Sequence, residues 1–180
     1  LLIDSGADIE AKNDGAWTPL LRTAFSNSLD VARLLIERGA DIEAMSSSDE
    51  TPVYMAVAMN SLDVARLLID SGADIEARAE LGATPLHLAA MQNSLDVARL
   101  LVDLGADIEA KEDKLGTTPL HLAVSENSLD VASLLIEKGA YIEAKYGLGW
   151  TPLAEAAWEN SLDVARLLID SGADIQGKSY

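Results

Sequence analysis

The two histidines are the side chains in this sequence best suited to metal ligation or proton transfer. His87 and His121 are 34 residues apart, and no third ligand accompanies them at a metal-binding spacing. A protein zinc site normally takes three or four ligands from its own chain. We therefore expect no metal site and no catalytic residue here.

Acidic pairs can serve as a general acid and base. One such pair, Asp41 and Glu43, flanks Ile42, and equivalent pairs recur along the chain. Side chains on either side of an inward-facing residue point away from the core. We therefore assign these acids to the structural framework and expect no acid–base catalysis from them.

The glycines at positions 147 and 149 could begin a phosphate-binding loop. Pro152, however, stands where a dinucleotide-binding fingerprint needs another glycine. The sequence also contains neither the G-x-S-x-G pattern of a nucleophilic serine nor the H-E-x-x-H pattern of a zinc protease. We predict that the chain is not an enzyme and binds no cofactor.

The composition narrows the classes of partner and location. The 180 residues are 49% hydrophobic and carry a net charge of −17, which would repel a nucleic-acid backbone. No apolar run approaches the roughly 20 residues of a membrane span, and no basic segment leads into an apolar one as in a signal peptide. The absence of cysteine fits a reducing compartment. We expect no nucleic-acid partner, no membrane partner and a cytoplasmic location.

An internal repeat determines how all of these residues are positioned. Thr-Pro followed by Leu or Val begins at positions 18, 51, 84, 118 and 151, at separations of 33, 33, 34 and 33 residues. Between these motifs, Asn-Ser-Leu-Asp-Val-Ala recurs almost unchanged. A fixed period of this size indicates one supersecondary unit that is stacked on its neighbours.

The third copy shows what each unit should look like. Thr84 is a natural helix N-cap and Pro85 a natural first helical residue. Asn93 tolerates the left-handed conformation and can end the first helix. Ser94 should then cap a second helix, which Gly105 ends.

The segment that follows the second helix differs in pattern. Residues 106–110 alternate apolar and polar side chains, which predicts a short extended arm leading to the next turn. Each unit is therefore a turn, a helix, a tight reversal, a second helix and an arm. The predicted fold class is all-α, with stacked helix-turn-helix units joined by short hairpin-like fingers.

These motifs resemble those of the ankyrin repeat family. Residues 84–90 read Thr-Pro-Leu-His-Leu-Ala-Ala, residues 118–123 repeat the pattern, and Leu-Leu-x-x-x-Gly-Ala-Asp occurs at 67–74. The resemblance implies a solenoid fold, a hydrogen bond from each histidine that steadies its turn, and a protein partner on the concave face and finger tips. This chain departs from the family in having Asn between the helices, and Arg22 and Glu155 where other copies have Leu.

The repeat also predicts the organisation of the chain as one solenoid domain. We expect a partial repeat over 1–12, repeats over 13–45, 46–78, 79–111, 112–145 (with one extra turn residue) and 146–178, and a tail over 179–180. Residues 1–6 align with the end of a second helix, so we expect a fragment of a longer array. Apolar surface is expected at both ends, which favours end-to-end self-association as an alternative function.

Partner-binding residues should lie where the copies differ, because the shared residues are occupied with folding. All three tryptophans and the only phenylalanine fall at such positions, and aromatic residues often anchor interfaces. With about 10 Å per helix pair, the aromatic groups of the first and fifth copies should lie about 40 Å apart and flank a polar middle. The predicted partner-binding residues are Trp17, Phe25, Ser26, Glu50, Met59, Met91, Gln92, Lys114, Glu126, Tyr146, Trp150, Trp158 and Glu159. We therefore expect a non-enzymatic scaffold for protein–protein interaction.

Overall fold

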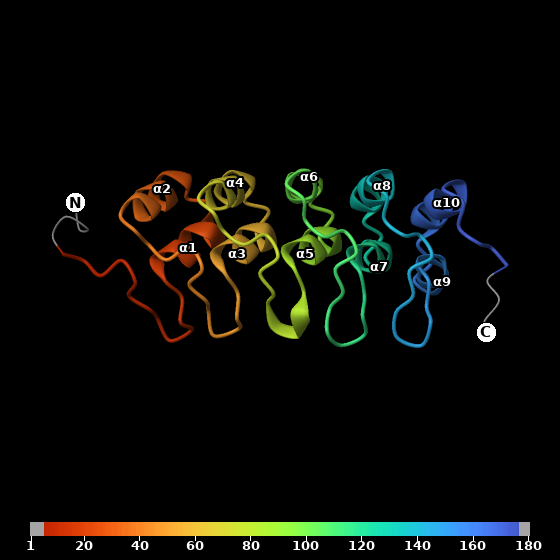
Figure 1. Ribbon diagram of the computed structural model, residues 1–180, viewed down its shortest axis with the longest axis horizontal. Helices are drawn as coiled ribbons and strands as arrows, with labels where there is room; N and C mark the ends of the chain where they lie inside the picture. The colour runs from red at the N-terminus through yellow and green to blue at the C-terminus, as the bar shows by residue number, and fades with distance from the viewer. Residues whose placement is uncertain (1–5, 177–180) are drawn as a thin grey trace. The chain divides into compact units, whose positions relative to one another are not determined.

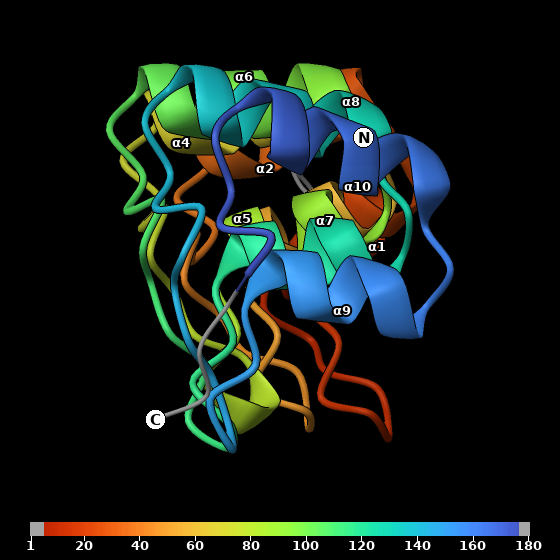
Figure 2. The same ribbon diagram turned by 90° about the vertical axis from the view of Figure 1, so that its right-hand side faces the viewer.

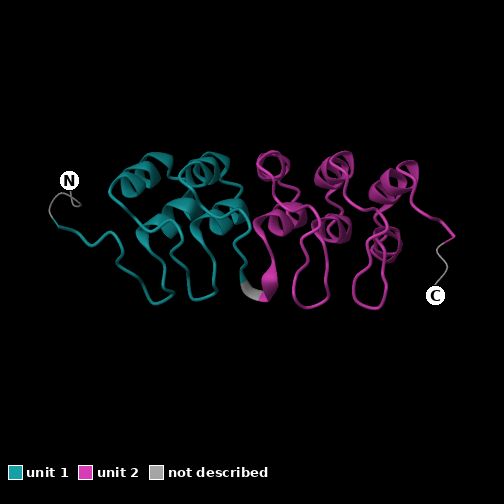
Figure 3. Ribbon diagram, viewed as in Figure 1, with its two compact units in different colours: residues 1–80 teal, residues 81–180 magenta. Residues whose placement is uncertain are grey.

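The computed structural model describes residues 6–176 of the chain. These residues form two compact units, residues 1–80 and residues 81–180 (Figure 3). The predicted apolar surface and truncated helix at residues 1–5 lie outside the described residues.

The first unit contains two helical hairpins. Its helices are α1 (Pro19–Ser26), α2 (Leu29–Glu37), α3 (Pro52–Ala58) and α4 (Leu62–Asp70). Helix α1 packs on α2 and α3, and α2 packs on α4. The shorter helices α1 and α3 thus form one layer and α2 and α4 form another (Figure 1).

The second unit repeats this plan three times. It contains the short 3-10 turn η2 (Glu80–Gly82), which begins at the last residue of the first unit, and the helices α5 (Pro85–Met91), α6 (Leu95–Asp103), α7 (Pro119–Ser125), α8 (Leu129–Glu137), α9 (Pro152–Trp158) and α10 (Leu162–Asp170). Helix α7 packs between α5 and α9, and α8 packs on α6 and α10. Figure 2 shows the two layers and the fingers that extend beyond the α5–α7–α9 layer. The predicted all-α fold of stacked helix pairs is confirmed.

Local sequence signals determine where the first helix of each pair begins and ends. Every first helix begins at the proline of a Thr-Pro motif. The Thr18 hydroxyl accepts a hydrogen bond from the Leu21 N–H at 3.3 Å, which satisfies one of the N–H groups at the helix start. Each reversal is made by an asparagine with a φ of 50–57°, at positions 27, 60, 93, 127 and 160, as predicted.

The prediction that serine caps the second helices is wrong in its hydrogen bonding. Ser94 stands at the N-cap of α6, but neither its side chain nor that of any other N-cap serine accepts a helical N–H. In two copies the hydroxyl instead approaches a carbonyl oxygen of the preceding first helix. Ser128 donates to the Met91 carbonyl at 3.4 Å, and Ser161 donates to the Val124 carbonyl at 3.3 Å. In these two copies, packing between repeats therefore takes the hydroxyl that a local cap would use.

The arm after each second helix is a turn and not the extended segment that alternation predicts. In the third copy, the Glu109 N–H donates to the Asp107 carboxylate at 2.9 Å, and the Ala110 N–H donates to the Asp107 carbonyl at 3.1 Å. An aspartate that bonds the backbone two residues later defines an Asx turn. The polar residues of the pattern therefore reflect turn formation.

The fingers are short hairpins joined to their neighbours. In the last finger, the Tyr146 N–H donates to the Trp150 carbonyl at 3.1 Å, and the two residues form an antiparallel bridge. The corresponding bond in the preceding finger runs from Glu112 to Thr117 at 3.1 Å and spans one residue more. Between these two fingers, the Gly147 N–H donates to the Leu115 carbonyl at 2.8 Å.

The core of each unit lies between the two helix layers. The second leucine of each Leu-Leu pair is at most 3% exposed, at positions 35, 68, 101, 135 and 168. Alanines such as Ala56 and Ala89 are fully buried and allow the helices to approach closely. A single helix pair would leave these side chains in water, so each repeat depends on its neighbour for stability.

Candidate functional site

The buried histidines join neighbouring repeats within the second unit. His121 is 2% exposed, and its Nδ1 accepts the Thr118 N–H at 3.2 Å. Its Nε2 is therefore the protonated nitrogen and donates to the Ala144 carbonyl at 3.0 Å. Burial lowers the pKa of His121, although the Ala144 carbonyl opposes this change. His87 also accepts the N–H of its N-cap threonine, Thr84, through Nδ1, and its Nε2 donates to a different acceptor, the Thr117 carbonyl just before the next Thr-Pro motif. The structural role implied for both histidines is confirmed.

The recurring acids also connect one repeat to the next. The Glu43 carboxylate accepts the Asp74 N–H at 2.8 Å, and the Glu109 carboxylate accepts the Tyr141 N–H at 2.7 Å. Glu143 accepts the Asp174 N–H in the same way at 2.7 Å. These carboxylates are therefore used in bonding the backbone of the following turn. Among the described residues, no group of three or more His, Cys, Asp or Glu is placed to hold a metal ion.

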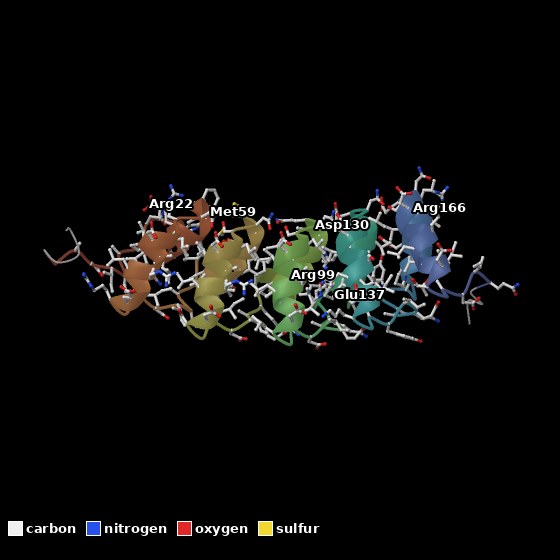
Figure 4. The ribbon with its side chains drawn as sticks, turned by 90° about the horizontal axis from the view of Figure 1, so that it is seen from above. Arg22, Met59, Arg99, Asp130, Glu137 and Arg166 are labelled. Atoms are coloured by element: carbon white, nitrogen blue, oxygen red, sulfur yellow. The ribbon has the colours of Figure 1, made fainter. Side chains whose placement is uncertain are left out.

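The first unit brings an aromatic pair together with an arginine. The rings of Trp17 and Phe25 meet edge to face, with their centroids 5.5 Å apart. The guanidinium carbon of Arg22 lies 5.7 Å from the Trp17 centroid and 5.8 Å from the Phe25 centroid, which is within cation–π range. Phe25 remains 44% exposed. We call these three residues the Trp17 cluster. Arg22 and Met59 lie along the same edge of this unit (Figure 4).

The second unit contains a related cluster with a carboxylate in place of the arginine. The Trp150 and Trp158 rings also meet edge to face, with centroids 5.7 Å apart, and Trp158 is 73% exposed. The Tyr146 hydroxyl donates to the Glu155 carboxylate. Burial and this hydrogen bond raise the pKa of Tyr146. We call Trp150, Glu155 and Trp158 the Trp158 cluster.

The two clusters occupy the same three positions of the repeat. These are the residue before the Thr-Pro motif, the fourth helical residue and the seventh helical residue: Trp17, Arg22 and Phe25 in one unit, and Trp150, Glu155 and Trp158 in the other. The sequence predicted the aromatic residues as candidates but not their pairing. It missed Arg22 and Glu155 as site residues, although their departure from Leu was the signal that could have found them.

The remaining candidate residues divide into exposed side chains and side chains with local structural bonds. The exposed group consists of Met59, Met91, Gln92, Lys114, Glu126 and Glu159. Glu50 is partly buried and accepts the Ser46 hydroxyl at 2.9 Å within its finger. Ser26 donates to the Arg22 carbonyl at 2.8 Å. Tyr146 is half-buried, and its ring packs edgewise on His121 with centroids 4.7 Å apart.

The outer helices present charge and not aromatic rings. Arg99 on α6, Glu137 on α8 and Arg166 on α10 are exposed on this layer (Figure 4). One ion pair, between Lys138 and Asp103 at 2.6 Å, links the ends of neighbouring outer helices in the second unit. An exposed pair of this kind contributes little to stability, because water and salt screen it.

The comparison with protein families identifies the architecture. A family model described as ankyrin repeats (3 copies) matches residues 1–79, 78–146 and 112–179. The chain belongs to the ankyrin repeat family. No curated protein matches it. Ankyrin repeats generally mediate protein–protein interaction and are typically non-enzymatic modules. Within residues 6–176, no helix combines the length and the apolar character needed to cross a bilayer.

Proposed function

We propose that this ankyrin repeat chain binds a partner protein through the Trp17 and Trp158 clusters. The observation that supports this most strongly is the Trp158 side chain, which is 73% exposed and contacts the Trp150 ring. A large ring that already packs on a neighbour loses little side-chain entropy when it is buried by a partner. Tryptophan is also the residue type most often found to dominate binding energy.

Exposed methionines at the ends of two other first helices fit the same role. Met91 and Met59 are 39% and 41% exposed at the ends of their first helices, where Phe25 and Trp158 also lie. Flexible methionine side chains adapt to the shape of a partner. The buried residues of the repeat, by contrast, are used in helix packing and in bonds between repeats.

The test is to capture partner proteins from an extract with the natural chain and with the double variant Phe25→Ala and Trp158→Ala. We expect the variant to lose the partners that the natural chain retains. Leu104→Ala is the matched control, because Leu104 is a 49% exposed apolar residue at the end of α6 and belongs to neither cluster. Equal capture by the natural chain and the double variant, with all chains equally folded by circular dichroism, would overturn the proposal.

A second candidate function is end-to-end self-association, and one observation favours it. The last helix and its turn leave Leu162, Ile169 and Ile175 exposed by 59%, 41% and 71%. Their equivalents in the preceding repeats are more buried, because the next repeat covers them. A sedimentation experiment tests this function: the natural chain should form larger species as its concentration rises, and Leu162→Glu should remain a monomer. A natural chain that stays monomeric at high concentration would exclude it.

A further inference from the structure

We propose that the Trp158 cluster binds an arginine side chain of the partner protein. This inference rests on the proposed function and specifies the chemistry of one of its two sites. The site would consist of the Trp150 and Trp158 rings and the carboxylates of Glu155 and Glu159.

The Trp17 cluster serves as an internal template for the Trp158 cluster. There, an edge-to-face aromatic pair already has a guanidinium against it, because Arg22 lies 5.7 Å and 5.8 Å from the two ring centroids. The ring faces carry partial negative charge, which attracts a cation. The Trp17 cluster therefore shows that an aromatic pair at these repeat positions can hold a guanidinium beside its rings.

The Trp158 cluster carries a different charge at the equivalent position of its repeat. Trp150 and Trp158 again meet edge to face, with centroids 5.7 Å apart in place of 5.5 Å and ring planes at 84° in place of 65°. The arginine is replaced by Glu155, which precedes Trp158 by three helical residues just as Arg22 precedes Phe25. Residues three apart share one face of a helix, so Glu155 and Trp158 lie on the same face of α9. The Trp158 cluster thus has the rings of the template and a negative charge where the template has its own cation.

The carboxylates of Glu155 and Glu159 bring negative charge to the Trp158 cluster, and one of them is held in place. Glu155 accepts the Tyr146 hydroxyl, which restrains the carboxylate. Glu159 follows in the next turn and is exposed, and its negative charge also raises the pKa of Tyr146. Two carboxylates on the helix that carries the exposed Trp158 ring favour a cationic ligand, and the net charge of −17 favours its approach.

The planar shape of guanidinium favours arginine over lysine as the occupant. A guanidinium can stack on an indole ring and at the same time donate hydrogen bonds to a carboxylate in its own plane. An ammonium group is a compact, strongly hydrated charge that does not stack in this way. The occupant we infer is therefore an arginine exposed on the surface of the partner protein.

The experiment uses a small probe, N-acetyl-arginine amide, and follows the indole N–H resonances of the three tryptophans by NMR. We expect the probe to shift the Trp150 and Trp158 resonances in a saturable manner and to leave the Trp17 resonance unchanged. N-acetyl-citrulline amide, which has nearly the same shape without the charge, should bind at least about fivefold more weakly. N-acetyl-lysine amide should also bind more weakly than the arginine probe.

Exchanging the charged residues between the clusters provides the sharpest test. Glu155→Arg should place the chain's own guanidinium against the rings and abolish the response to the probe. Arg22→Glu should create a new response at Trp17, because that cluster then has the charge of the Trp158 cluster. Glu155→Gln keeps an acceptor for the Tyr146 hydroxyl but removes the charge, and it should weaken probe binding about threefold to tenfold.

The outcomes separate this inference from the proposed function. Failure of the arginine probe to shift Trp158, equal binding of the citrulline or lysine probe, or no effect of either charge exchange would overturn the arginine site. If the double variant Phe25→Ala and Trp158→Ala still loses its partners in that case, the proposed function stands without this site. If partner capture is also unaffected by the double variant, both proposals fail.

Discussion

The Nε2 atom of His121 lies 3.0 Å from the carbonyl oxygen of Ala144, in the turn that leads to the following repeat. The same imidazole accepts the Thr118 N–H through Nδ1 and packs against the ring of Tyr146. One side chain therefore steadies its own helix start and connects it to the next finger. This connection also positions the Trp158 cluster, because Tyr146 holds Glu155.

Replacing His121 with alanine should destabilise the second unit. The change removes a buried ring and leaves the Thr118 N–H and the Ala144 carbonyl without their partner, which should cost about 2 kcal/mol. Urea unfolding followed by circular dichroism measures this loss. Lys145→Ala changes an exposed neighbour and is the control. A loss no larger than that of the control would contradict the role assigned to the histidine.

The stability of the second unit should depend on pH through His121. Its pKa in the folded chain lies below the ordinary value, mainly because of burial. As the pH falls through about 6.5, the unfolded state gains a proton that the folded state does not accept, so the free energy of unfolding decreases. Unfolding should therefore need less urea at a pH of about 5.5 than at about 7.5. The same pH dependence in a His121→Gln variant would assign the effect to other groups.

A carboxylate in the longer finger should stabilise the chain only when it is ionised. Burial opposes the ionisation of Glu112, but hydrogen bonds from the N–H groups of Lys114, Leu115 and Thr117 outweigh this effect and lower its pKa. Its stabilising contribution is thus present at neutral pH and is lost as the pH falls through the lowered pKa. Glu112→Gln should be less stable than the natural chain at neutral pH and nearly equal to it in acid. Glu137→Gln removes the same charge at an exposed position of α8 and is the control, which should change the free energy of unfolding little at neutral pH.

The asparagine between the two helices of each repeat should tolerate glycine but not alanine. Asn127 has a φ of 53°, in the left-handed region that alanine enters only with strain. Asn127→Ala should therefore lower the free energy of unfolding by about 1 kcal/mol, whereas Asn127→Gly should change it much less. Thermal or urea unfolding of the two variants checks this directly. Equal losses would mean that the asparagine side chain, and not the backbone, determines the preference.

The acids that bridge neighbouring repeats should matter more than acids on the outer helices. Glu43 accepts the Asp74 N–H at 2.8 Å, so Glu43→Ala should destabilise the first unit by about 1 kcal/mol. Glu37 has the same charge but lies exposed at the end of α2, and Glu37→Ala should have little effect. The two variants lose the same charge, so their difference in urea unfolding isolates the backbone bond. No difference between them would remove the bridging role.

The sequence alone determined the features that depend on neighbours along the chain. The period predicted the helix pairs, Pro85 and its equivalents marked the helix starts, and Asn93 and its equivalents marked the reversals. These signals are reliable because backbone angles are restricted within a few residues, whatever packs around them. The buried leucines followed from the same period, because a repeated apolar face has to be covered by the next copy.

Only the tertiary structure decided which polar and aromatic groups meet across repeats or between a finger and its helix. Ser128 was expected to cap its own helix, yet it bonds a carbonyl 37 residues earlier, and Glu43 bonds an N–H 31 residues later. The sequence marked Trp150 and Trp158 as separate candidates, and the structure shows that the finger lies against α9 so that their rings meet. A side chain bonds whichever partner the packed repeats bring within about 3 Å. That partner depends on how one repeat is positioned against the next, which no local pattern encodes.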